Sequence, residues 1–366
     1  MNWDALVVGG GPAGSSSAYH LSRLGFRVLL LEKKPLPRFK LCAGCLSART
    51  LRLLPSGYED LLLNRIRVGR LAFRGEEHRL EAKEEIAYIV DRKDFDHFLV
   101  LKALESGAEL LRGEFLAFQK EGARYRVYTT HGSFLVDYLV GADGMRSRVA
   151  RLLGYKKKKL FKSLEFFTEG DLRYEVLIEL GLIRNGYLWL FPHGDGVSMG
   201  LASTHREDLF KILFEYSKAK GIRFKHPLGW HIPYAEGEKD IHIGKERVLL
   251  VGDAANMTDP LLGEGIYYAL WAGSLLASSI EKEPSNPTVG YKKLLKPLAE
   301  ELHYAGKIAR LAYSFQGIAY NMGKSFALKS FYELLLGRKS YKELYKGGLF
   351  SFLKDLLLEK LPFTRL

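Results

Sequence analysis

The chain has 366 residues, 47% of them hydrophobic and 27% charged, which suits two interleaved domains with a well-buried core. This composition excludes a disordered chain, and the presence of two cysteines argues against a disulfide framework and fits a reducing cytoplasm. The net charge of +13 is spread along the chain rather than clustered with aromatic residues, so we expect no nucleic-acid partner. Glutamine is scarce while Lys and Glu abound, a composition compatible with a thermophile.

The N-terminal segment combines the parts of a dinucleotide-binding unit. An apolar strand over residues 5–8 is followed by Gly9-Gly10-Gly11-Pro12-Ala13-Gly14, a helix over 15–24, and a second strand over 27–31 that ends at Glu32. In such a unit the first glycine makes the tight turn, the second admits the pyrophosphate, the third allows helix–strand packing, and the acid binds the adenosine ribose. We therefore predict a dinucleotide site, against the alternative of a Gly-rich turn in another α/β domain. Met1 leads almost directly into the strand, so we expect no signal peptide.

The middle of the chain alternates between strand-like and helix-like segments. Short strands are expected around Val68–Phe73 and His78–Ala82, a helix over 91–104, and strand pairs over 110–140. Residues 156–240 are predicted to form an antiparallel sheet with one helix over 206–219. The lysine run 156–159 is interpreted as a solvated loop between domains.

Two further strand ends carry Gly and Asp. One strand ends at Gly141 and is followed by Asp143 and Gly144, and another over 248–251 is followed by Gly252 and Asp253. The second turn continues through Gly263-Glu264-Gly265 into a helix over 266–280, whose N-terminus offers unpaired N–H groups to an anion. Asp253 can accept hydrogen bonds from sugar hydroxyls, and the glycines let the backbone approach a flat ligand.

An aromatic stripe follows an expected strand. Tyr187, Trp189 and Phe191 alternate, so all three side chains project from one face. Such a stripe suits an apolar wall for an alkene or a polyprenyl tail, although an ordinary core-facing sheet surface has the same pattern.

The three Gly/Asp turns, at Gly9, Asp143 and Gly252, together resemble the FAD-binding pattern of the p-hydroxybenzoate hydroxylase superfamily. There the first turn holds the pyrophosphate, the central Asp-Gly lies near it, and the last Gly-Asp holds the ribityl chain. Two more segments resemble the geranylgeranyl reductase family, whose members reduce isoprenoid double bonds. That family has K-x-C-G-G where this chain has Lys40-Leu41-Cys42-Ala43-Gly44-Cys45, and Y-x-W-x-F-P, which the segment from Tyr187 to Pro192 matches in full. The resemblance runs from about residue 4 to residue 280.

The resemblance implies FAD as the cofactor and assigns residues to it. Arg92 stands where the superfamily often has an Arg near the flavin, although a surface charge at a helix start explains it equally well. The expected FAD-binding residues are Gly9, Gly11, Pro12, Ala13, Gly14, Glu32, Lys33, Cys42, Ala43, Gly44, Arg92, Phe115, Asp143, Gly144, Gly252, Asp253, Gly263, Gly265 and Ile266. The expected substrate-binding residues are Tyr187, Trp189, Phe191 and Pro192, and no metal site is expected.

Cys42 is the expected catalytic residue, as a single thiol near the isoalloxazine that delivers a proton or shapes the site. A redox-active Cys42–Cys45 dithiol is the alternative. Disulfide reductases of that kind need a second nucleotide-binding domain, however, and this chain contains no second complete G-x-G-x-x-G.

The implied activity is that of an FAD-dependent oxidoreductase. It would reduce double bonds of a polyprenyl lipid or quinone tail by hydride from reduced flavin, with NAD(P)H or ferredoxin as electron donor. A flavin-dependent aromatic hydroxylase or halogenase on the same fold is the main alternative, and a non-catalytic FAD-fold lipid-binding protein is a third. A hydroxylase needs oxygen, whereas a reductase works without it.

The expected fold is α/β (α+β overall), with a Rossmann-like FAD domain assembled from residues 1–64, 91–155 and 241–285. A mostly antiparallel substrate domain takes residues 65–90 and 156–240, and a helical region takes 286–366. Residues 296–366 contain 12 Lys and Arg against 6 Asp and Glu, and the run 349–358 pairs apolar and basic faces. These helices either dock on the protein body or meet a membrane from the cytoplasm, and no apolar run reaches transmembrane length.

Overall fold

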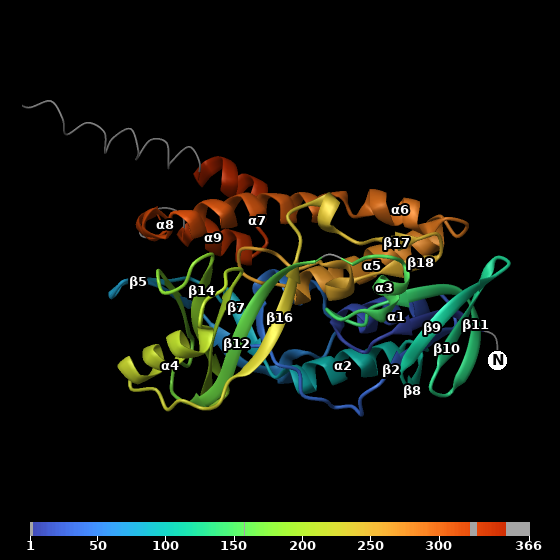
Figure 1. Ribbon diagram of the computed structural model, residues 1–366, viewed down its shortest axis with the longest axis horizontal. Helices are drawn as coiled ribbons and strands as arrows, with labels where there is room; N and C mark the ends of the chain where they lie inside the picture. Colours follow the sequence, from blue (N-terminus) through green and yellow to red (C-terminus); the bar gives the residue numbers. More distant parts are fainter. Residues whose placement is uncertain (1–2, 157, 323–327, 349–366) are drawn as a thin grey trace, which may run out of the picture.

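The structure is a computed structural model that describes residues 3–156, 158–322 and 328–348. Two large sheets lie side by side along the long axis of the molecule, and the C-terminal helices cover one side of both (Figure 1). The expected α/β architecture with a helical C-terminal region is confirmed.

The first sheet contains the nucleotide-binding unit. Its central order is β17-β18-β11-β1-β2-β8, with parallel pairing from β18 through to β8. The hairpin of β9 and β10 extends the first half of β11 in antiparallel fashion. The strands are β1 (Trp3–Val8), β2 (Val28–Glu32), β8 (Glu109–Arg112), β9 (Phe115–Glu121), β10 (Arg124–Thr129), β11 (Gly132–Gly141), β17 (Gly244–Lys245) and β18 (Val248–Leu250).

Helices bury the centre of this sheet. Strand β2 is buried along its whole length, as expected for a parallel strand covered by helices. Helix α1 (Pro12–Arg23) packs on β1 and β2 and contacts both α2 (Arg92–Glu105) and α5 (Ile266–Lys282). Helix α1 begins three residues before the expected helix, because Pro12 occupies its first turn, where no N–H partner is required. The short helix α3 (Arg148–Leu152) follows the end of β11.

The second sheet is mostly antiparallel, in the order β16-β12-β15-β14-β13-β5-β6, with one parallel pair between β5 and β13. Helix α4 (Leu209–Ala219) covers one face, where Leu188, Leu201 and Leu213 form a core. The opposite face carries Phe161 and Trp189. The strands are β5 (Val68–Phe73), β6 (Glu76–Glu81), β12 (Lys159–Glu169), β13 (Glu175–Leu180), β14 (Gly186–His193), β15 (Gly196–Ser203) and β16 (Leu228–Tyr234).

A small third sheet joins the expected domains. Strand β7 (Ala87–Val90) pairs with β3 (Cys45–Ser47) on one side and β4 (Leu62–Ile66) on the other. A strand of the segment 65–90 thus pairs with strands from the segment 1–64, and the domain boundaries at 64 and 90 stay a prediction.

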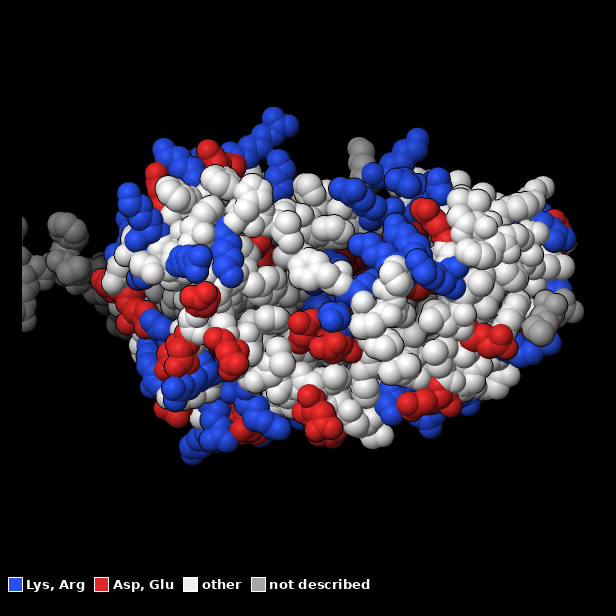
Figure 2. All heavy atoms as spheres, turned by 90° about the horizontal axis from the view of Figure 1, so that it is seen from below, with Lys and Arg blue, Asp and Glu red and all other residues white. Residues whose placement is uncertain are grey.

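The C-terminal region is helical where the structure describes it. Helices α6 (Pro287–Leu294) and α7 (Lys296–Ser314) run along the top of the molecule in Figure 1, and α8 (Gln316–Met322) and α9 (Leu328–Leu335) follow over the second sheet. No helix in the described parts of the chain is long and apolar enough to cross a membrane. The apolar and basic run 349–358 lies outside the described residues. On the face in Figure 2, Lys and Arg side chains gather beside a hollow near the middle, and charges of both signs mix elsewhere.

Candidate functional site

The turn between β1 and α1 is shaped by its glycines. Gly9 has φ +106°, and a Cβ there would lie 2.5 Å from the Ala142 carbonyl oxygen. A Cβ on Gly14 would lie 1.8 Å from the Gly9 carbonyl oxygen, so both positions require glycine. At Gly11 the nearest atom to an added Cβ is an Arg38 guanidinium nitrogen at 3.5 Å. This residue caps α1 without a side-chain hydrogen bond, which leaves the first-turn N–H groups available to an anion.

Glu32 at the end of β2 is held in place by backbone hydrogen bonds. Its side chain is buried, with Oε2 accepting a hydrogen bond from Gly10 N at 2.8 Å and Oε1 accepting one from Lys34 N at 2.9 Å. The Arg38 guanidinium lies 3.5 Å from Oε2. The neighbouring Lys33 is exposed. A buried carboxylate beside the Gly-rich turn fits the ribose contact expected of this residue.

The Asp143 carboxylate forms hydrogen bonds within the protein. It accepts hydrogen bonds from Ser147 Oγ at 2.5 Å, Arg148 N at 2.7 Å and Val149 N at 3.3 Å. These bonds cap α3. Gly144, with φ +75°, has no atom within 4 Å of an added Cβ and borders open space. Phe115 is buried in the core of the first sheet, where its carbonyl oxygen accepts a hydrogen bond from Arg148.

The turn after β18 brings the end of the FAD pattern against its beginning. Gly252 has φ +66°, and a Cβ there would lie 2.6 Å from Cβ of Ala13 in the first turn of α1. The Asp253 side chain has one long contact, with Thr258 Oγ1 at 3.4 Å. Two turns separated by about 240 residues of sequence therefore meet at the carboxyl end of the parallel strands, where ligands bind in open α/β sheets.

The structure corrects the expectation that the lysine run 156–159 is a solvated loop. Lys158 is not simply a solvated loop residue, because its ammonium donates to the Asp253 carbonyl oxygen at 2.8 Å. Burial lowers the pKa of Lys158 to about 8, although the carboxylates of Asp253 and Asp143 oppose that shift. The sequence analysis missed this residue as a member of the site. Its neighbour Lys159 pairs instead with Glu236 and Asp240.

Arg92 is buried, so its interpretation as a surface charge is wrong. It forms a bidentate ion pair with Asp96, one helical turn later, and also hydrogen-bonds the Cys42 sulfur. Burial disfavours its charge, but Asp96 and Cys42 outweigh burial and raise the pKa of Arg92. Asp96 also pairs with Arg38 at 3.1 Å, which connects the Cys42 region to the Glu32 region. The i,i+4 spacing of Arg92 and Asp96 was the sequence signal for this pair.

Cys42 and Cys45 are both free thiols. Gly44 N lies 3.5 Å from the Cys42 sulfur, and a Cβ on Gly44 would lie 1.9 Å from the Val90 carbonyl oxygen. Burial raises the pKa of Cys45 to about 12. A thiol with so high a pKa is a poor nucleophile, which disfavours the dithiol alternative.

Lys40 lies at the same end of the site as Cys42. Its ammonium stands 4.1 Å from the ring centroid of Trp230 on β16. Burial and the nearby Arg92 lower the pKa of Lys40, while Asp253, Cys42 and Asp96 oppose the shift. The loop from residue 40 to residue 44 thus contacts the second sheet through Lys40 and also lies close to Arg92 of α2.

The three motif aromatics share one cluster on the second sheet. Tyr187, Trp189 and Phe191 pack with Phe161 and with Ala43, which belongs to the Cys42 loop. The Tyr187 hydroxyl donates to the Leu262 carbonyl oxygen, and its ring stacks on Tyr313 of α7 with 6.5 Å between centroids. Strand alternation places Pro192 on the opposite face, with Leu188 and Leu190. The aromatic face therefore lies beside the Cys42 loop and beneath the C-terminal helices.

A buried ionic cluster holds the Gly263-Glu264-Gly265 turn. Arg49 pairs with Glu264 and lies 3.6 Å from Glu301 of α7, while Ser47 also hydrogen-bonds Glu264. A Cβ on Gly263 would lie 3.7 Å from the Tyr187 hydroxyl, and Gly265 is the residue before α5. Ile266, at the start of α5, packs against the core that contains Leu46 and Phe95. This cluster ties the turn to the C-terminal helices.

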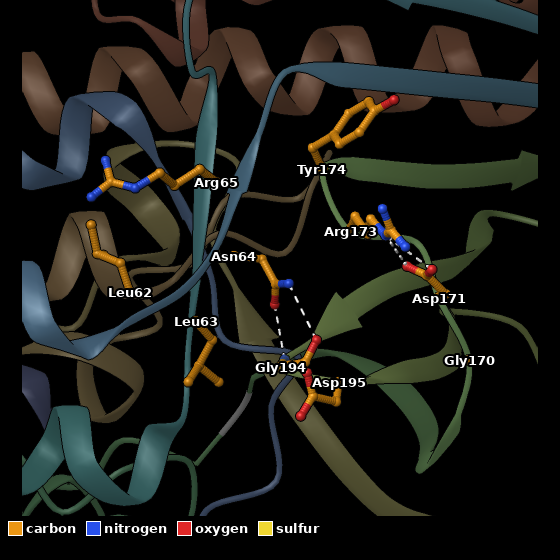
Figure 3. Close-up of a pocket in the computed structure, with 10 residues that line it drawn as sticks. All are labelled: Leu62, Leu63, Asn64, Arg65, Gly170, Asp171, Arg173, Tyr174, Gly194 and Asp195. Carbon is orange, nitrogen blue, oxygen red and sulfur yellow. Dashed lines mark hydrogen bonds and ion pairs between the residues drawn. The ribbon is translucent and has the colours of Figure 1, made fainter.

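A separate recess of about 640 Å³, drawn in Figure 3, is lined by other residues than these motifs. Two of its lining residues are bonded to each other, because the Asn64 side chain forms two hydrogen bonds with the Gly194 backbone, at 2.9 and 3.3 Å. Asp171 and Arg173 pair with each other at its edge. None of its lining residues belongs to the FAD or aromatic motifs, so we assign it no role.

Comparisons with known proteins bear on the site as a whole. A family model described as an FAD binding domain matches residues 2–220. The chain is 30% identical over 301 residues to the geranylgeranyl diphosphate reductase of Rhodobacter capsulatus, covering 76% of this chain and 75% of that protein. It is also 30% identical over 316 residues to digeranylgeranylglycerophospholipid reductase 2 of Methanothermobacter thermautotrophicus, covering 77% and 79%.

Two solved structures share the fold. A geranylgeranyl bacteriochlorophyll reductase-like protein from Thermoplasma acidophilum has a TM-score of 0.79 at 21% identity, covering 97% of this chain and 99% of that one. A flavin-dependent brominase has a TM-score of 0.77 at 17% identity, covering 97% and 100%. At these identities the two likenesses show the architecture alone.

Proposed function

We propose, from the premise that this chain belongs to the geranylgeranyl reductase family of FAD-binding proteins, that it reduces carbon–carbon double bonds of a polyprenyl chain. FAD is the cofactor, and the chain is an FAD-dependent oxidoreductase. The observation that carries the proposal is the contact between the aromatic cluster of Tyr187, Trp189 and Phe191 and Ala43 of the Cys42 loop. This contact places an apolar wall next to the segment between Glu32 and the two cysteines.

The residues present fit FAD. The N-terminus of α1 and Gly11 would hold the pyrophosphate, Glu32 the ribose, and Asp253 the ribityl chain, with Lys158 beside it. Bound and reduced, FAD supplies a hydride for the alkene. The protein supplies orientation and an apolar, water-poor channel, for which Trp189 and Phe191 provide flat surfaces.

The proposed substrate class is a polyprenyl chain with an anionic head. The two relatives are named for geranylgeranyl diphosphate and for a digeranylgeranyl glycerophospholipid, which share a geranylgeranyl chain and phosphate. An aromatic wall suits the hydrocarbon, and a quinone tail of the same hydrocarbon type would meet the same wall.

Cys42 is proposed to line the reaction site. It lies beside Arg92 and is close enough to Lys40 for their charges to interact, and its neighbour Ala43 belongs to the aromatic cluster. We assign it the role of shaping the site around the alkene. Exchange of Cys42 for Ser should then alter which double bonds are reduced while FAD stays bound.

The electron donor is proposed to act without a nucleotide domain of its own. In the parts of the chain that the structure describes, one strand–glycine turn–helix unit with the dinucleotide fingerprint occurs, and FAD uses it. NAD(P)H would then dock transiently, or a ferredoxin would reduce FAD directly.

Anaerobic reduction tests the function. The FAD-loaded protein is reduced with dithionite under nitrogen and mixed separately with geranylgeranyl diphosphate and with a digeranylgeranyl glycerophospholipid. Mass spectrometry should find products with one added hydrogen pair for each reduced double bond. Loss of the reduced-flavin spectrum without hydrogen gain in any polyprenyl compound would contradict the proposal.

The second candidate is an oxygen-dependent hydroxylase or halogenase, which the fold shared with the brominase supports. Oxygen distinguishes the two functions. A reductase consumes reduced FAD with the polyprenyl substrate under nitrogen, whereas a hydroxylase or halogenase needs oxygen and adds oxygen or halogen to its product.

A further inference from the structure

A buried carboxylic acid lies on the aromatic face of the second sheet. Glu165 on β12 is directly opposite Gly200 on β15, and Gly200 is directly opposite Trp189 on β14. A Cβ on Gly200 would lie 2.3 Å from the Trp189 ring, so the glycine makes room for the indole beside Glu165. Because directly paired residues point to the same side of a sheet, Glu165 shares the face of Trp189.

A hydrogen-bonded chain connects these residues. Trp189 Nε1 donates to Ser198 Oγ at 3.2 Å, and Ser198 Oγ donates to Glu165 Oε1 at 2.6 Å. Among the described residues, Ser198 is the one that hydrogen-bonds the Glu165 carboxyl. The indole donor thereby fixes the direction of the serine hydroxyl and leaves Oε2 of Glu165 to carry an acid proton.

The environment of Glu165 keeps its carboxyl protonated up to about neutral pH. Burial raises the pKa of Glu165 to about 7, although Ser198, Lys40 and Arg92 pull it down. Tyr187 on β14 is a further titratable neighbour on this face, and His193 lies beyond Phe167 near Asp91. Among the described residues, neither Lys40 nor Arg92 forms an ion pair with Glu165. The acid thus faces the Cys42 loop without a counter-ion of its own.

We propose that Glu165 is the acid that protonates the second alkene carbon. The inference rests on the proposed function, because it assigns the proton that the hydride transfer requires. When bound and reduced, FAD would supply a hydride, with its two electrons, to one alkene carbon, and the Glu165 proton would bond to the other carbon. Two C–H bonds would replace the π bond, the external electron donor would restore the two electrons, and the Glu165 carboxylate would recover its proton from water.

Infrared titration of the FAD-loaded protein tests the protonation without turnover. At neutral pH wild type should show the C=O stretching band of a protonated carboxyl group, and Glu165→Gln should lower the intensity of this band. The exposed Glu169, at the end of the same strand, provides the matched control Glu169→Gln, which should keep the band. The assignment is overturned if Glu165→Gln leaves the neutral-pH band unchanged.

Single-turnover kinetics test the transfer itself. We expect Glu165→Gln to retain FAD and to slow oxidation of reduced FAD by the polyprenyl substrate by about 10²–10⁴-fold, the usual contribution of a general acid. Glu165→Asp keeps the acid and should recover part of the rate, and Ser198→Ala should move the pH profile. If Glu165→Gln oxidises reduced FAD at a rate within a few-fold of wild type, the assignment of Glu165 is overturned while the proposed function stands. If wild type itself reduces no polyprenyl compound, the proposed function fails and the assignment fails with it.

Discussion

Gly252 and Ala13 are in direct contact, although they belong to opposite ends of the FAD-binding pattern. A Cβ on Gly252 would lie 2.6 Å from the Ala13 Cβ, and the left-handed φ of +66° further disfavours any other residue. This contact sets the spacing between the turn that would hold the pyrophosphate and the turn that would hold the ribityl chain.

We predict that Gly252→Ala lowers FAD affinity at least tenfold, because the added methyl group pushes the last turn away from α1. Gly122 is a matched control, with φ +61° and no atom within 4 Å of an added Cβ. Gly122→Ala should cost about 1 kcal/mol of unfolding free energy from its backbone alone and leave FAD affinity unchanged. Fluorescence titration with FAD measures the affinities. Equal affinities for the two variants would contradict the role of the Gly252–Ala13 contact.

Asp253 and Asp143 should respond differently to removal. Among the described residues the Asp253 carboxylate accepts one long hydrogen bond, so Asp253→Ala should weaken FAD binding by about 1.5–3 kcal/mol, or about 10- to 150-fold, with little loss of stability. Asp143 caps α3, so Asp143→Ala should lower the unfolding free energy by about 0.5–2 kcal/mol. Titration with FAD and thermal unfolding of both apoproteins separate the effects. Unchanged FAD affinity in Asp253→Ala would exclude its ribityl contact.

Motifs that shape the backbone could be predicted from the sequence, and networks formed by folding could not. The turn at Gly9 and the strand ending at Glu32 could be predicted locally, because the glycines and the continuous apolar run that define them lie within a few residues of each other. Lys158 could not be placed in the same way, because its partner Asp253 is 95 residues away. Its position in a lysine run suggested that its side chain is exposed to solvent, whereas the fold directs its ammonium toward the Asp253 carbonyl oxygen.

Glu165 and Arg49 show the same limit on the prediction. Glu165 is an acid between apolar residues in the middle of β12, a visible signal, but its partner Ser198 is on another strand and gives no local pattern. Arg49 meets Glu264 and Glu301 only because the fold brings the turn before α5 and helix α7 against the residues that follow β3, more than 200 positions away in the sequence. Asp143 shows the reverse case, because its motif was recognised while its local role as a helix cap was not.

Trp189 should affect alkene reduction more than FAD binding. Trp189→Ala removes the centre of the aromatic face and should slow polyprenyl reduction at least tenfold while FAD remains bound. The cavity left by Trp189→Ala also lowers the free energy of unfolding by about 3–5 kcal/mol, so a control variant of similar burial is needed. Leu188→Ala opens a cavity on the opposite face of β14, in the core under α4, and should destabilise the protein without slowing reduction per bound FAD. Equal rates for the two variants would mean that the aromatic face is ordinary core.

The stability of the protein should depend on the charge of Asp259. Burial, with Glu264 adding to it, raises the pKa of Asp259 from 3.8 to about 6. The folded state therefore holds a proton that the unfolded state releases, and stability falls as pH rises from about 4 to 6. Asp259→Asn mimics the protonated form, and its amide can donate to the Tyr341 hydroxyl that contacts Oδ2. Its stability relative to wild type should therefore grow by about 2–3 kcal/mol across that range. Chemical denaturation of both proteins across this pH range measures the difference, and a constant difference would contradict the raised pKa.

The C-terminal helices should carry any contact with a membrane. Large apolar side chains are exposed where α7 ends and α8 begins, namely Leu311, Phe315 and Ile318, and residues 296–366 carry 12 basic against 6 acidic residues. Such a surface combines apolar burial with attraction to anionic lipid. The full chain should therefore co-sediment with anionic but not neutral vesicles, and high salt should release it.

Phe315→Ser should weaken this binding severalfold, whereas Phe210→Ser on α4 should not, although the two side chains are similarly exposed, at 53% and 45%. Equal loss in both variants would place the contact elsewhere on the protein. Absence of binding to either kind of vesicle would leave the helices as a cover over the aromatic face, which the stacking of Tyr313 on Tyr187 already provides in part.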